Sequence, residues 1–152
     1  MGNGVTFLVF SQEPGCPPFE RLATNGARFF STALELLEQR EESVVIRLVC
    51  SRPALRGDFR IASRATTRDD LMDAREAEAR GRAGGMAALA EKCKQIWTIE
   101  GVGAESPPEA ARLTLAGICA SVALGPVLPP DGSTLFGVRG AIERRDKALP
   151  AG

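Results

Sequence analysis

The stretch Asn25-Gly26-Ala27-Arg28-Phe29-Phe30, followed by Val44-Val45-Ile46-Arg47-Leu48-Val49-Cys50, decides the fold that the sequence predicts. From about Asn25 to Arg40, apolar residues recur every three or four positions, as on one face of an amphipathic helix. The residues on that face are Ala27, Phe30, Ala33, Leu34 and Leu37. The segment from Val44 to Cys50 is almost continuously apolar, which predicts a strand covered on both faces.

A further strand is predicted before this helix. The segment from Val5 to Phe10 is rich in β-branched and aromatic residues, which favour buried strands. A strand, a helix and a strand of these lengths predict a right-handed crossover between two parallel strands.

The rest of the chain predicts two more strands and a closing helix. Apolar and polar residues alternate from Asp58 to Ser63 and from Gln95 to Glu100, which is typical of strands. Ser106-Pro107-Pro108-Glu109 predicts a helix start with Ser106 as the cap, and the helix should run to about Leu124. Residues 64–94 are charged and rich in alanine, so they predict an inserted helical segment, and Thr67 with Asp70 resembles a capping box at its start.

Without the insertion, the predicted order of elements is β-α-β-β-β-α. This order predicts an α/β fold of the thioredoxin-like type, with a four-stranded mixed sheet, and the alternative is a ferredoxin-like or other open α/β sandwich. We expect a thioredoxin-like domain over residues 1–124, a helical insertion at about 64–94 and a C-terminal extension over 125–152.

The composition argues against several classes of function. The 152-residue chain has 19 basic and 19 acidic residues, a balance that disfavours a free-standing nucleic-acid-binding protein. It has no histidine, the commonest general base and zinc ligand, and its four cysteines form no C-x-x-C pair. No apolar run is long enough for a transmembrane helix. We therefore expect no catalytic residue, no metal site and no cofactor.

The helix and the strand quoted at the outset also resemble motifs of a known family. The residues Gly26-Ala27-Arg28-Phe29-Phe30 and Val45-Ile46-Arg47-Leu48-Val49-Cys50 are similar to those of a thioredoxin-like family. A small accessory subunit of mitochondrial NADH:ubiquinone oxidoreductase (respiratory complex I) and two mitochondrial ribosomal proteins share this family. The resemblance continues through Pro53 and Phe59-Arg60-Ile61, and covers roughly residues 5–63 and 95–124. The aromatic residue usual on the third strand is missing.

This resemblance implies a non-catalytic accessory subunit of complex I. Such a protein would bind other subunits on the matrix side of the mitochondrial inner membrane, peripheral to the membrane and not spanning it. The alternative is a mitochondrial ribosomal protein of the same family, with ribosomal RNA as its partner. The neutral charge favours complex I, because ribosomal proteins are usually strongly basic. No DNA partner is expected.

Two cysteines are candidates for redox chemistry. Cys16 follows the first predicted strand, where thioredoxins carry their nucleophile, and Cys16-Pro17-Pro18-Phe19 resembles a glutaredoxin motif. A further alternative is therefore a monothiol glutaredoxin-like oxidoreductase that uses Cys16. Cys50 would end the strand parallel to the first one, and the complex I subunit is similar in carrying a cysteine pair. A Cys16–Cys50 disulfide is one expectation, and two free thiols packed as small apolar groups are the other.

Three arginines are candidates for binding a partner, namely Arg28, Arg47 and Arg60. Their guanidinium groups could hold a carboxylate of a neighbouring subunit, a cardiolipin headgroup or an RNA phosphate. The alternative is that they form local ion pairs with nearby carboxylates, which are those of Glu20, Glu35 and Asp58.

Overall fold

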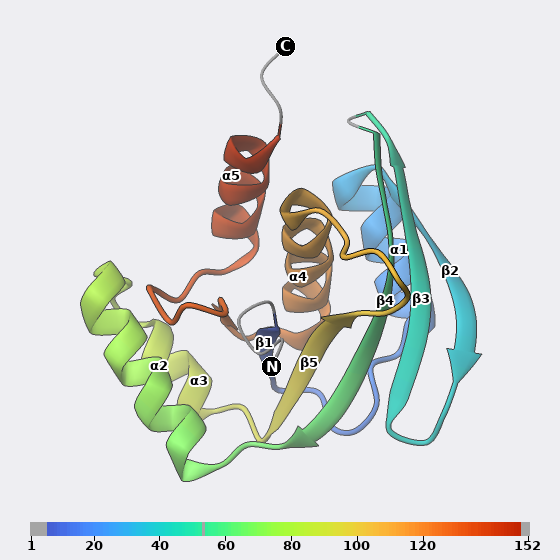
Figure 1. Cartoon of the computed structure of the whole chain (residues 1–152). Helices are drawn as coiled ribbons and strands as arrows, with labels where there is room; N and C mark the ends of the chain where they lie inside the picture. Colours follow the sequence, from blue (N-terminus) through green and yellow to red (C-terminus); the bar gives the residue numbers. More distant parts are fainter. Residues whose placement is uncertain (1–5, 53, 150–152) are drawn as a thin grey trace.

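The computed structural model describes residues 6–52 and 54–149, which form a six-stranded antiparallel sheet and five helices (Figure 1). Neighbouring strands follow the order β2-β3-β4-β5-β1-β6. The strands are β1 (Phe7–Ser11), β2 (Thr32–Gln39), β3 (Ser43–Ser51), β4 (Ala54–Ala65), β5 (Gln95–Gly101) and β6 (Val127–Leu128). The helices are α1 (Phe19–Phe30), α2 (Arg68–Gly81), α3 (Met86–Glu91), α4 (Glu109–Ala123) and α5 (Val138–Ala148). The predicted mixture of helices and strands is confirmed.

The helix predicted from Asn25 to Arg40 is wrong in its second half. Helix α1 ends at Phe30, because Ser31 adopts a left-handed conformation with φ of 50° and its N–H bonds to the Gly26 carbonyl oxygen. The residues after it form β2, with Leu34 facing the core. Apolar side chains recur with helical spacing across this junction, but a spacing of three or four also fits a strand that contains a bulge. Such a bulge occurs where the pairing with β3 shifts between Leu36 and Glu38.

This extra strand also makes the predicted parallel crossover wrong. Strand β3 pairs antiparallel with β2, while β1 pairs antiparallel with β5 and β6 on the other side of the sheet. The sheet is therefore not four-stranded and mixed, and the parallel strand pair of a thioredoxin-like core is not present among the described residues. Val5, in the first predicted strand, and Pro53, in the predicted turn, lie outside the described residues.

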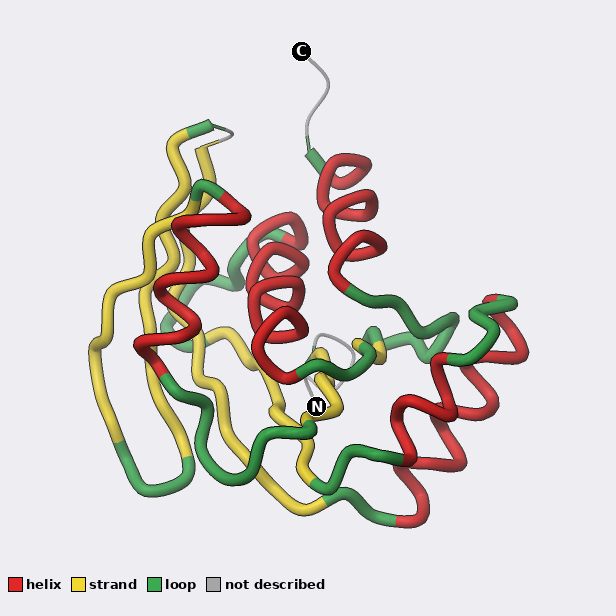
Figure 2. The backbone as a smooth tube through the Cα atoms, turned by 180° about the vertical axis from the view of Figure 1, so that it is seen from behind, coloured by secondary structure: helices red, strands yellow, loops and turns green. Residues whose placement is uncertain are grey.

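The apolar strand predicted from Val44 to Cys50 is confirmed as β3, but only one of its faces is covered. Val44, Ile46 and Leu48 are fully buried; on the opposite, more open face Val45 is buried, whereas Arg47 and Val49 are partly exposed. Figure 2, seen from behind, shows α1 and α4 in front of the sheet, so these two helices cover the buried face.

Helix α4 is the centre of the core. Almost every residue on it is buried, because it is enclosed by the sheet, α1 and α5. A Cβ on Gly117 would lie 2.9 Å from the ring of Phe30 and 3.1 Å from the Cβ of Ala141, so the absent side chain lets α1 and α5 approach α4 closely. The residues after α4, in the segment predicted as an extension, form β6 against β1 and then α5 against α4. They therefore share the core of the domain.

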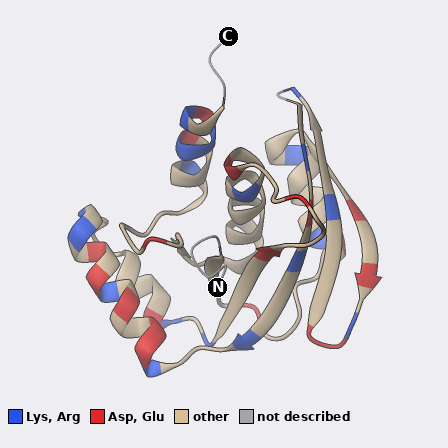
Figure 3. Cartoon of the chain, in the orientation of Figure 1, with Lys and Arg blue, Asp and Glu red and all other residues tan. Residues whose placement is uncertain are grey.

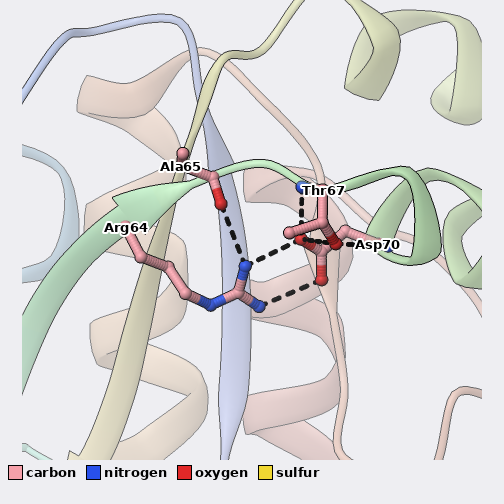
Figure 4. Close-up of polar contacts among 4 residues, drawn as sticks. All are labelled: Arg64, Ala65, Thr67 and Asp70. Atoms are coloured by element: carbon pink, nitrogen blue, oxygen red, sulfur yellow. Dashed lines mark hydrogen bonds and ion pairs between the residues drawn. The ribbon is translucent and has the colours of Figure 1, made fainter.

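The predicted helical insertion lies between two strands that pair directly, β4 and β5. It forms α2 and α3, which pack a smaller apolar cluster against the other face of β1 and β5. Thr67 and Asp70 form the capping box predicted for its start, and Arg64 from the end of β4 donates to the same carboxylate (Figure 4). This network holds the insertion to the end of the sheet.

Candidate functional site

A cavity of about 410 Å³ lies where α4 and α5 meet the beginning of β1 and the segment between β6 and α5. Its size falls in the range of small-molecule binding sites. The lining residues are Phe7, Glu109, Arg112, Leu113, Pro129, Pro130, Asp131, Ser133, Phe136, Arg144, Lys147 and Ala148. They come from distant parts of the chain, and α5 forms one side of the cavity through Arg144, Lys147 and Ala148.

One wall is a turn that the sequence encodes locally. Pro129-Pro130-Asp131-Gly132 is a β-turn in which the N–H of Gly132 donates to the carbonyl oxygen of Pro129 over 3.0 Å. Proline suits the second position of such a turn, and Gly132, with φ of 65°, supplies the left-handed residue at its end. Arg80 of α2 donates to the Gly132 carbonyl oxygen at 3.0 Å, which anchors this wall to the insertion.

Arg112, in the first turn of α4, is the residue that distinguishes this cavity. Its side chain is buried, with only 9% of the residue exposed. One terminal nitrogen donates to the hydroxyl oxygen of Ser106, but Nε is covered from solvent and has no acceptor. No ion pair involves Arg112 within residues 6–52 and 54–149. A buried cation with neither a carboxylate nor a full set of acceptors is costly, so the site favours an anion that enters from outside the chain.

The local backbone explains why Arg112 is buried. The predicted N-cap, Ser106, does not cap α4: Pro108 takes that position, and the Ser106 hydroxyl accepts from Arg112 instead. Gly101, at the end of β5, has no side chain, and a Cβ there would lie 2.5 Å from Pro107 and 3.7 Å from the guanidinium. The absence of that Cβ lets Pro107 and Arg112 pack over the strand end.

Two more cations line the cavity from α5, and Figure 3 shows several basic positions on this helix. The guanidinium carbon of Arg144 lies 4.5 Å from the centroid of the Phe136 ring, a cation–π contact that holds it over the apolar wall. Lys147 lies one turn further along and is exposed. The N-terminus of α4 adds the positive end of a helix dipole at the same place.

Two acidic side chains, Glu109 and Asp131, moderate this positive charge. The backbone N–H of Ser133 donates to Asp131 over 3.0 Å, and this hydrogen bond, together with one from the Ser133 side chain, outweighs burial and lowers the pKa of Asp131. Asp131 is therefore ionised at neutral pH. With three cationic and two acidic side chains, the lining carries a net charge of +1.

The three arginines predicted to bind a partner are not brought together. Arg28 is exposed on α1 and stacks over the neighbouring ring of Phe29, 5.6 Å from its centroid. Arg47 makes two hydrogen bonds to Asp58 across β3 and β4, at 2.9 and 3.1 Å, which raise the pKa of Arg47 and lower that of Asp58. For Arg47, the alternative of a local ion pair is therefore the one observed.

Arg60 is exposed on the same open face of the sheet as Arg47, two residues after Asp58 on β4. No ion pair of Arg60 is formed within the part of the chain that the structure describes. It faces away from the cavity, since the cavity lies on the side of α4 and α5.

The two candidate cysteines lie at opposite ends of β2 and are both free. Cys16 accepts a hydrogen bond from Gln39 at one end, and Cys50 donates to the Ser31 carbonyl oxygen beside the other. At a rise of about 3.3 Å per residue, these ends are roughly 20 Å apart, too far for a disulfide. The expected Cys16–Cys50 bridge does not fit this fold, because the parallel pair that would bring the two thiols together is not formed.

The thiol of Cys16 also lacks the features of an activated nucleophile. Burial raises its pKa, and the hydrogen bond from Gln39 offsets only part of that effect. A reactive cysteine needs the opposite shift, which a helix N-terminus or a neighbouring cation would provide.

Sequence reasoning missed Arg112, Arg144 and Lys147. One signal for Arg112 was available, since it is the only charged residue between Glu109 and the end of an otherwise apolar α4. Nothing comparable marks the two residues of α5, whose last turns are charged throughout.

No protein-family model, curated protein or solved structure matches this chain. Within the described ranges, no cluster of three or more side chains is suited to hold a metal ion. The helices of residues 6–52 and 54–149 include none with the length and apolar character needed to cross a membrane.

Proposed function

We propose that this protein is a non-catalytic binding protein that holds a carboxylate or phosphate group in the cavity between α4 and α5. The observation that carries this proposal is the buried guanidinium of Arg112, which lines the cavity and forms no ion pair within residues 6–52 and 54–149. Removing one partner of a buried charge is costly because the charge is left uncompensated. An anion bound to the terminal nitrogens of Arg112 would compensate this charge.

The remaining contacts support binding and not catalysis. The cavity offers cations and apolar walls, and none of its lining residues is a cysteine. Arg144 and Lys147 add attraction for an anion near the mouth, and they lie on a helix that packs mainly on α4.

An NMR titration of the full chain tests this function. We would record amide spectra while adding sodium acetate or sodium phosphate at constant ionic strength, with sodium chloride as the reference salt. Saturable shifts are expected at amides near Arg112, Phe136 and Arg144 in the wild type. The Arg112→Met variant should lose them.

A matched control separates a specific site from a general effect of charge. Arg60→Met removes the same charge from the open face of the sheet, so it should retain the wild-type titration. Saturation that survives in Arg112→Met, or shifts no larger than those with chloride, would exclude the anion site.

The relationship to the complex I subunit remains a second proposal, with a mitochondrial ribosomal protein as its alternative. Its support is the two motifs at residues 26–30 and 45–50, and the antiparallel sheet counts against a thioredoxin-like relationship. Co-migration with NADH dehydrogenase activity on a native gel would support it, whereas co-sedimentation with ribosomal RNA would favour the alternative. A matrix location, peripheral to the inner membrane, follows only if one of these results is obtained.

A further inference from the structure

We infer that the ligand of the Arg112 cavity is a monocarboxylate with an apolar body, held with its carboxylate at Arg112 and its body against Phe7, Leu113 and Phe136. This inference rests on the proposed function and names the class of ligand for the same site. It follows from the charge of the lining, the shape of the guanidinium and the nature of the walls.

The charge of the lining favours a single negative charge. Three cations and two carboxylates leave a net charge of +1, and Asp131 stays ionised because its pKa is lowered. A monocarboxylate would neutralise this charge. A phosphate monoester carries nearly two negative charges near neutral pH, so it would leave the site with excess negative charge beside Glu109.

The type of side chain favours a planar anion. Guanidinium presents its N–H groups as a flat fork that matches the two oxygens of a carboxylate. Nε of Arg112 is the donor without an acceptor, and one terminal nitrogen donates to Ser106. Nε is covered from solvent, so a ligand carboxylate would accept from the terminal nitrogens, where its two oxygens match the flat fork and balance the buried charge.

The walls favour an apolar body. Phe7, Leu113 and Phe136 are each 5% exposed or less and face the cavity beside Pro129 and Pro130. The guanidinium carbon of Arg144 lies 4.5 Å from the centroid of the Phe136 ring, so a charge stands beside this apolar wall. A ligand that is only an anion, such as acetate, would make no use of these apolar walls.

Calorimetric titration of the full chain with straight-chain carboxylates, from acetate to octanoate, tests the inference. Each methylene that enters the cavity should tighten binding about threefold to fourfold, until the cavity is full. The primary alcohol of the same chain length should bind at least about tenfold more weakly, because it lacks the charge that Arg112 requires. The alkyl phosphate of the same length should also bind more weakly than the carboxylate.

The variant Glu109→Gln tests the charge argument at an exposed residue of the lining. Removing this negative charge should improve the alkyl phosphate relative to the carboxylate. Glu105→Gln is the matched control, since Glu105 is exposed in the preceding loop and does not line the cavity. An unchanged ratio in Glu109→Gln would contradict the charge argument.

The outcomes separate this inference from the proposed function. Affinity that does not depend on chain length, or an alkyl phosphate that binds more tightly than the carboxylate, would overturn the inference. The anion site itself would still stand if Arg112→Met abolished that binding. If none of these anions bound, the proposed function would fail together with the inference.

Discussion

Arg64 donates two hydrogen bonds to the carboxylate of Asp70, at 2.7 and 3.0 Å, and so joins the end of β4 to the first turn of α2 (Figure 4). The same carboxylate accepts from the backbone N–H and the hydroxyl of Thr67. Asp70 is nearly buried, whereas Arg64 is partly exposed. One carboxylate therefore receives four donors, and the orientation of α2 depends on it.

Replacing Asp70 with alanine should lower the free energy of unfolding by about 1–3 kcal/mol. The variant would lose the capping box and leave Arg64 without its partner. Asp73→Ala, on the exposed side of the same helix, should change stability by less than about 0.5 kcal/mol. Denaturant unfolding of both variants would measure the difference, and equal midpoints would contradict this role of Asp70.

The same carboxylate should make stability depend on pH in acid. Burial would raise the pKa of Asp70, but the hydrogen bonds from Arg64 and Thr67 outweigh it, and the pKa is lowered from 3.8. The unfolded chain then takes up the proton first, so the stabilisation present above pH 3.8 is lost as pH falls through the lower, folded pKa. The stability difference between wild type and Asp70→Asn should therefore shrink below that pH, and a difference constant with pH would refute the assignment.

Arg112→Met should stabilise the protein without ligand by about 1–2 kcal/mol, because it replaces an unpaired buried cation with an apolar chain. Arg60→Met, on the open face of the sheet, should be nearly neutral. Thermal unfolding in a buffer without carboxylates or phosphate would measure both. A marked loss of stability in Arg112→Met would mean that the guanidinium is a structural element and not a binding group.

Gly125→Ala should destabilise the fold by about 2 kcal/mol or more, because a Cβ there would lie 1.9 Å from the backbone oxygen of Phe10. This contact joins the end of α4 to β1, so neither backbone can move freely. Gly84→Ala is the control, since a Cβ at Gly84 meets nothing within 4 Å. Similar unfolding midpoints for the two variants would show that α4 and β1 are less closely packed than the structure indicates.

All four cysteines should be recovered as thiols when the protein is unfolded without a reducing agent. In the folded protein, the thiols of Cys93 and Cys119 should resist alkylation, because burial raises the pKa of both, that of Cys93 to about 11. Cys16 is partly exposed and should react slowly at neutral pH. Intact mass would detect the loss of two hydrogens that a Cys16–Cys50 disulfide requires.

The sequence predicted several strands and helices from clear local patterns. Strand β3 follows from its continuous apolar run, strands β4 and β5 follow from alternation, and the start of helix α2 follows from the Thr67–Asp70 capping box. The boundary between α1 and β2 was not predicted by these patterns. Ser31 is an unusual residue for a left-handed helix end, and the bulge after Leu36 keeps a helical spacing of apolar residues inside a strand. A single missed helix end therefore changed the predicted topology from parallel to antiparallel.

The candidate site could not be predicted from the sequence for a different reason. Phe7, Arg112 and Arg144 come from β1, α4 and α5, which meet only in the folded chain, and α5 lies in the segment predicted as an extension. A charged residue within an apolar helix can be seen in the sequence, but the absence of its partner can be seen only once every neighbour is in place. The prediction of no metal site or cofactor stays a prediction.

The order of strands in the sheet has a consequence for how the protein acquires its cavity during folding. Strands β2, β3 and β4 are consecutive hairpins, so they can form early from local contacts. Strand β1 must wait for β5, because its partners begin more than eighty residues later, at Gln95. Phe7 then joins the cavity wall only after that long loop has closed, and α5 follows all six strands in the chain. The cavity should therefore form after the hairpins of β2, β3 and β4.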